Sequence, residues 1–175
     1  MKLISVITGY LLAIPAGAQT LVWDIALKIE TAPNDWAGRF LGKTFPGVIR
    51  VDSSRLLGVG EEQLGFDEFD PAFTLSLTFD EGIYSASDDP AAGLPILYFS
   101  DGELMELDFA VYLSAPPYGE GSYFQLHPDG LLNYSPDGVG EYEGSYLISS
   151  SSIPEVSITS FALIFLSLTL ISRKR

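Results

Sequence analysis

The sequence predicts an all-β domain, an antiparallel β-sandwich or flattened barrel of about eight to ten strands. We expect an N-terminal signal helix before this domain and a C-terminal transmembrane helix after it. Three segments, 21–29, 73–79 and 105–113, alternate apolar and polar residues. A period of two places each apolar set on one face of a strand, and strands with one wet face are typical of antiparallel sheets.

Turn residues support the same fold class. Asp101-Gly102 separates the run 96–99 from the strand predicted over 104–113, and Asp-Gly in such a place is a strong hairpin signal. Pro128-Asp129-Gly130 and the segment 135–138 predict two further turns. The glycine-spaced segment 38–52 reads as a strand, a turn and a second strand. No stretch of residues 19–152 has a helical period over eleven positions.

The N-terminus has the layout of a secretory signal peptide. Lys2 is followed by a mostly apolar run over 3–14, and Ala16 and Ala18 place small residues at the −3 and −1 positions of a cut before Gln19. We therefore expect residues 1–18 to be removed on export.

The C-terminus predicts a membrane-spanning helix with a basic end. Residues 156–172 carry no charge, no glycine and no proline, and as a helix they would span roughly 25 Å. Arg173, Lys174 and Arg175 follow, and the positive-inside rule keeps such an end in the cytoplasm. With an exported N-terminus, residues 19–152 would then lie outside the cytoplasm.

The residues just before this helix add a motif. Pro154-Glu155 stands directly at its start, after a run of serines. This order of Pro-Glu, helix and basic end resembles the PEP-CTERM sorting signal of bacterial exported proteins, although Val156 stands where the usual motif has its second proline. The resemblance implies recognition and processing by an exosortase-like membrane enzyme, through Pro154, Glu155 and the basic end. It implies no activity for the domain that is carried.

These segments give the expected organisation of the chain: a signal peptide over 1–18, an acidic β-domain over 19–148, a serine linker over 149–152 and a PEP-CTERM-like tail over 153–175. Length after removal of both ends suffices for one domain with a core. Without cysteine, the exported domain relies on packing and not on disulfides.

The predicted domain is strongly acidic. Residues 19–152 hold five Lys and Arg against 22 Asp and Glu, a net charge of −17. A surface of this kind repels nucleic acid and anionic membrane, because binding to either depends on Lys and Arg. It is typical of a soluble extracellular domain.

Candidate binding sites follow from the acids and the tyrosines. Loop-like acidic clusters make Asp67, Asp70, Asp88 and Asp89 candidate calcium ligands, because calcium prefers carboxylate and carbonyl oxygens. Tyrosines gather in the last third of the sequence, where exposed rings would stack on sugars and buried rings would serve the core. These tyrosines are Tyr118, Tyr123, Tyr134, Tyr142 and Tyr146.

Catalytic motifs are weak in comparison. His127 is the only histidine and stands before Pro128-Asp129-Gly130, a turn. We therefore interpret the chain as a non-enzymatic exported protein of the envelope or extracellular matrix. Two alternatives remain: a carbohydrate- or calcium-binding β-module on a plain single-pass anchor, and a glycosidase that uses two carboxylates.

Overall fold

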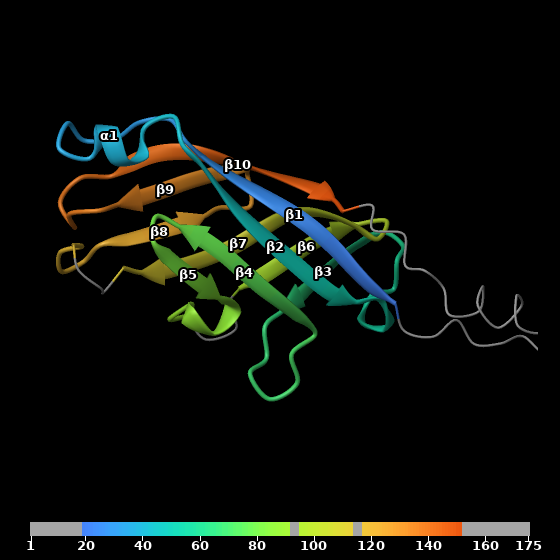
Figure 1. The fold of residues 1–175 in the computed structure, drawn as a ribbon. Coiled ribbons are helices and arrows are strands. Elements are labelled where there is room, and N and C mark those ends of the chain that lie inside the picture. Colours follow the sequence, from blue (N-terminus) through green and yellow to red (C-terminus); the bar gives the residue numbers. More distant parts are fainter. Residues whose placement is uncertain (1–18, 92–94, 114–116, 152–175) are drawn as a thin grey trace, which may run out of the picture.

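The computed structural model describes residues 19–91, 95–113 and 117–151, in which ten strands form one curled antiparallel sheet (Figure 1). The strands are β1 (Thr20–Ile29), β2 (Thr44–Asp52), β3 (Glu61–Gly65), β4 (Phe73–Phe79), β5 (Gly82–Ser85), β6 (Ile96–Ser100), β7 (Glu103–Tyr112), β8 (Tyr123–Leu126), β9 (Leu131–Ser135) and β10 (Tyr142–Ser150). A helical turn α1 (Ala37–Phe40) and two 3₁₀ turns, η1 (Ser53–Arg55) and η2 (Ala86–Asp88), complete the described elements. The all-β antiparallel prediction is confirmed.

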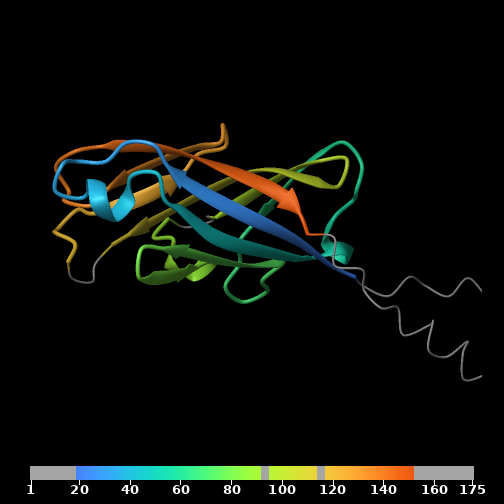
Figure 2. The ribbon, with the colours of Figure 1, turned by 45° about the horizontal axis from the view of Figure 1, so that its top comes forward.

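The strand order is β3-β6-β7-β8-β9-β10-β1-β2-β4-β5. The sheet curls so that its two halves face each other, with β1, β2 and β4 lying over β6 and β7 in Figures 1 and 2. Aromatic contacts span the interior: Trp23 of β1 meets Phe99 of β6 at 5.7 Å between ring centroids, and Phe79 of β4 meets Phe124 of β8 at 4.9 Å. The core therefore lies inside the curl.

Alternation along each strand builds this core. In β1 the side chains of Trp23, Ile25, Leu27 and Ile29 are buried, while the side chains between them face outward. β4 buries Phe73, Leu75, Leu77 and Phe79 in the same way. Each large apolar side chain buried in this manner contributes about 1.5–3 kcal/mol to folding.

The hairpin expected at Asp101-Gly102 is confirmed. β6 and β7 pair from Ser100↔Glu103 onward, which leaves only Asp101 and Gly102 in the loop. Both have positive φ, 51° and 82°, as the tight two-residue turn between twisted strands requires.

Two local expectations were wrong. The segment 38–42 is not a strand: α1 occupies Ala37–Phe40, because one helical turn brings Phe40 into the core, where it stacks on Trp36 and on Phe79. Met105 does not face the core either. A β-bulge shifts the β6–β7 register here, so that Leu104 is buried and Met105 is 58% exposed.

The two ends of the described domain are neighbours. β1 pairs with β10 up to Trp23↔Ser150, and the Ser151 amide donates to the Val22 carbonyl at 2.8 Å. Ser149 and Ser150 therefore belong to β10 and not to a linker. We call this end of the sheet, where Gln19 and Ser151 lie, the proximal end, and the opposite end, which carries α1 and the β4–β5 turn, the distal end (Figure 1). The predicted signal helix and the predicted tail lie outside the described residues.

Candidate functional site

A continuous band of polar and aromatic side chains covers the outer surface of β3 and β6–β9. Cross-strand register places these side chains on one face: Gln63 is opposite Tyr98, Tyr98 is opposite Glu106, and Tyr112 is opposite Tyr123. We call this band the outer polar face. Its members are Glu61, Gln63, Tyr98, Glu106, Asp108, Tyr112, Tyr123, Gln125 and Asn133, together with His127, whose ring contacts Asn133.

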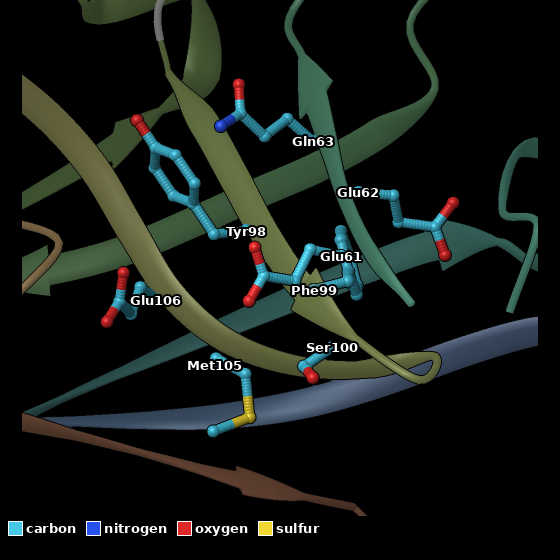
Figure 3. Close-up of a pocket in the computed structure, with 8 residues that line it drawn as sticks. All are labelled: Glu61, Glu62, Gln63, Tyr98, Phe99, Ser100, Met105 and Glu106. Carbon is cyan, nitrogen blue, oxygen red and sulfur yellow. The ribbon is translucent and has the colours of Figure 1, made fainter. Parts of the chain in front are cut away.

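One end of the outer polar face is hollowed. An open hollow of about 720 Å³ lies over β3, β6 and β7 and is lined by Glu61, Gln63, Tyr98, Met105 and Glu106, among others. Figure 3 shows Gln63 and Tyr98 side by side, while the carboxylate of Glu62 points away from them. That carboxylate accepts hydrogen bonds from the amides of the preceding loop, at 2.8 and 3.0 Å. The hollow thus presents one aromatic ring between carboxylates and an amide.

The other end holds a second, smaller hollow of about 210 Å³, lined in part by Pro90, Ala110, Tyr112, Tyr123 and Gln125. Tyr112 is 63% exposed, so most of its ring faces solvent. Like the first hollow, this one therefore combines tyrosine rings with the side-chain amide of a glutamine.

A chain of hydrogen bonds joins the side chains of β8 and β9. The Asn133 amide nitrogen lies 3.2 Å from His127 Nε2 and donates to Glu141 Oε1 at 3.1 Å, and the Tyr123 hydroxyl donates to the same oxygen at 3.2 Å. A carboxylate only accepts, so the Asn133 nitrogen is the donor in both of its contacts and His127 Nε2 is an acceptor. His127 therefore serves to position Asn133. Burial and the contact with Glu141 raise the pKa of Tyr123, so its hydroxyl stays a donor.

Asp108 occupies the middle of the outer polar face, opposite Ile96 on β6. Partial burial raises its pKa and nearby Asp89 raises it further, while His127 lowers it when its ring is protonated. Asp89 itself accepts a hydrogen bond from the Ala110 amide at 2.8 Å, on the edge of β7 that β6 leaves free. Asp108 and Asp89 thus place two neighbouring carboxyl groups at this part of the sheet.

A separate polar cluster ties three segments together at the distal end. Asp80, in the β4–β5 turn, accepts from Arg39 Nε at 2.8 Å and from the Tyr118 hydroxyl at 2.5 Å, and Arg39 also forms an ion pair with it through its terminal nitrogen. Tyr118 stacks on Trp36, and the Arg39 guanidinium lies 5.5 Å from the centre of the Trp36 ring. This cluster holds α1, the β4–β5 turn and the segment before β8 in contact.

Electrostatics strengthen the same cluster. Burial acts to raise the pKa of Asp80, but the hydrogen bonds from Arg39 and Tyr118 and the charge of Arg39 outweigh it, so the pKa lies below its usual range. Burial and the Asp80 carboxylate raise the pKa of Tyr118 far above its ordinary value. Asp80 is thus a largely shielded anion with two hydrogen-bond donors, and the cluster is a structural clamp.

The four candidate calcium ligands lie in two separate loops and have local partners. Asp67 accepts from the Phe69 amide and Asp70 forms an ion pair with Arg55. Asp88 closes a capping box with Ser85, and Asp89 accepts from the Ala110 amide. Among the described residues, no three His, Cys, Asp or Glu side chains are grouped so that they could hold a metal ion. The cleavage residues Ala16 and Ala18 and the sorting residues Pro154, Glu155, Arg173, Lys174 and Arg175 lie outside the described residues.

The tyrosines divide between core and surface. Tyr134 and Tyr146 are buried, and Tyr118 and Tyr142 pack against the core. Of the five tyrosines expected in the last third, Tyr123 belongs to the outer polar face. Tyr98 and Tyr112 were not predicted as surface tyrosines. The alternation of 96–100 and 105–113 did contain a signal for them, because each tyrosine falls on a polar position of its strand.

No family model matches the chain, and neither a curated protein nor a solved structure matches it. Among the helices in the described ranges, none has the length and apolar character needed to cross a membrane.

Proposed function

We propose that this chain is a non-enzymatic bacterial protein that is exported and displayed at the cell envelope or in the extracellular matrix. In this proposal residues 1–18 direct export, and the PEP-CTERM-like tail from Ile153 sorts the domain through an exosortase-like enzyme or, if it is not processed, anchors it in the membrane.

The observation that best supports display is the pairing of β1 with β10. This pairing puts Ser151 beside Val22, three residues from Gln19, at the proximal end, so a tail that continues from Ser151 would tether the domain by that end alone. The distal end and the outer polar face would then be free to meet the surroundings. The acidic surface agrees with this placement, because it would be repelled by anionic lipid headgroups.

The tail is tested by changing the motif without changing the apolar run. In Glu155→Ala the length and hydrophobicity of residues 156–172 are unchanged, so membrane insertion should persist while recognition of the motif fails. We expect a full-length, membrane-bound form to accumulate in the native host. The measurement is the mass and the membrane fraction of wild type and variant side by side.

Val156→Pro is the matched counterpart, because it completes the Pro-Glu-Pro motif and should increase the processed fraction. If wild type and both variants are equally full-length and membrane-bound, processing is refuted and a plain single-pass anchor remains. If wild type stays in the cytoplasm with Met1 intact, display itself is refuted.

A further inference from the structure

We propose that the outer polar face binds a polysaccharide that carries protonated amino groups. This inference concerns binding and does not depend on how the tail is processed.

The shape of the face fits an extended chain. Tyr98 lies opposite Glu106, and Tyr112 is six positions after Glu106 on β7, which is about 20 Å along a strand. The larger hollow lies at one end of this distance and the smaller hollow at the other. Aromatic rings at both ends of a shallow band suit the flat apolar faces of sugar rings better than they suit a compact ligand.

The polar groups between the tyrosines suit sugar hydroxyls. The amides of Gln63 and Gln125 each offer donors and an acceptor, and Asn133 is held in place by His127 and Glu141. A positioned amide loses little side-chain entropy when it binds, so it contributes more to affinity than a free one.

Charge selects the class of polysaccharide. Residues 56–151, which include every strand of the outer polar face, contain 18 Asp and Glu and no Lys or Arg. All five basic residues of the domain lie between positions 28 and 55. An anionic glycan would be repelled, whereas ammonium groups would pair with Glu61, Glu106 and Asp108. These carboxylates lie on the same face as the tyrosines. This favours an amino-sugar chain over a basic peptide, because sugar rings can stack on the tyrosine rings and a basic peptide does not need them.

The experiment compares two glycans that differ only in their amino groups. Full-length protein, purified in detergent, is titrated by calorimetry with glucosamine hexamer and with its fully N-acetylated counterpart, at a mildly acidic pH where the free amines are protonated. We expect the deacetylated hexamer to bind at least about tenfold more tightly, since several exposed ion pairs each contribute modestly. Added salt should weaken its binding.

Variants then locate the site. Tyr98→Ala and Tyr112→Ala should each reduce the affinity about 3–10-fold, and Glu106→Gln about 2–5-fold. Phe69→Ala and Glu68→Gln remove an exposed ring and an exposed carboxylate in the β3–β4 loop, off the face, and should leave the affinity unchanged. Unchanged far-UV circular dichroism and melting temperature confirm that each variant is folded.

Three results would overturn the proposal. Equal binding of the two hexamers would show that the amino groups play no part. Absence of binding to the deacetylated hexamer would refute the site. If Tyr98→Ala and Tyr112→Ala bind as wild type does, and polylysine competes equally in all three proteins, the attraction is charge alone and not a glycan site.

Discussion

At the residue scale, Asp80 is the side chain on which the distal end depends. Its side chain is 9% exposed and that of Arg39 is 30% exposed, so the pair is largely removed from water. An ion pair of this kind is destabilising when one partner is lost, because the other charge stays buried without compensation. Arg55 and Asp70 form an ion pair of the same two residue types, but both side chains are exposed to solvent.

We therefore predict that Asp80→Asn lowers the free energy of unfolding by about 3 kcal/mol, at the low end for a buried pair because Arg39 keeps some exposure. Asparagine tolerates the positive φ of 54° at this position, so the turn itself is retained. Asp70→Asn, the control, should change the free energy by less than about 1 kcal/mol. Urea unfolding of the three proteins measures both values.

The stabilisation by Asp80 should also depend on pH. Because the pKa of Asp80 in the folded state lies below its ordinary value, the stabilisation is fully present above the unfolded-state pKa and is lost as pH falls through the folded-state value. Asp80→Asn should flatten the acid limb of the stability profile. Equal losses from Asp80→Asn and Asp70→Asn, with parallel acid limbs, would contradict the clamp.

The sequence predicts which face of a strand a residue lies on, but not which residue of the neighbouring strand it meets. Alternation correctly predicts that Phe109 and Val111 face the core. It does not reveal that Tyr112 and Tyr123 meet across β7 and β8, because cross-strand pairing is a tertiary property that no local pattern encodes. The Asp80 clamp was missed for the same reason, since its two partners, Arg39 and Tyr118, lie 41 and 38 positions from Asp80 in sequence.

At the element scale, β7 changes partners along its length. Its residues up to Asp108 pair with β6, and Phe109–Tyr112 pair with β8. The Tyr146 hydroxyl of β10 fills the place where the ladder ends: it accepts from the Leu107 amide at 3.1 Å and contacts the carbonyls of Leu107 and His127 at 3.0 and 2.6 Å. Burial raises the pKa of Tyr146 to about 12, so the hydroxyl keeps its proton.

Tyr146→Phe should lower the free energy of unfolding by about 1–3 kcal/mol, since it leaves the Leu107 amide without its partner in a buried place, while the His127 carbonyl keeps the Gly130 amide as a donor. Tyr142→Phe is the matched control, because the Tyr142 hydroxyl makes no hydrogen bond to another described residue; it should stay within about 0.5 kcal/mol of wild type. Hydrogen exchange at Leu107 reports the local loss. Protection unchanged at Leu107 would show that the hydroxyl does not close the ladder.

Strands could be predicted where the alternation of apolar and polar residues was long. β1, β4 and the β6–β7 hairpin follow from alternation and from Asp101-Gly102. α1 is only four residues long, too short for a helical period, and it forms because Phe40 has a place in the core. The bulge at Met105 had one sequence signal, the adjacent apolar residues Leu104 and Met105, which a strict period of two cannot place on one face.

At the scale of the whole molecule, the two chain ends and the outer polar face lie on different parts of the sheet. The chain enters β1 and leaves β10 at the proximal end, while the strands of the outer polar face, β3 and β6–β9, form one side of the curl. The five basic residues are confined to β1, β2 and the links beside them, Lys28, Arg39, Lys43, Arg50 and Arg55. Such a charge distribution keeps Lys and Arg out of the strands of the outer polar face and leaves its carboxylates available to a cationic ligand.

The central claim, that this domain is displayed outside the cytoplasm by its proximal end, is tested most directly at its two lysines. Lys28 and Lys43 are the only lysines between residues 19 and 152, both are exposed, and both lie at the distal end, where the Ile29 amide bonds to the Lys43 carbonyl. Intact cells of the native host are treated with a membrane-impermeant amine reagent, and the modified peptides are identified by mass spectrometry. We predict modification of both lysines in intact cells, absent from a variant with Lys28→Arg and Lys43→Arg, while a cytoplasmic marker protein stays unlabelled. Modification of Lys28 and Lys43 only after cell lysis would contradict the account.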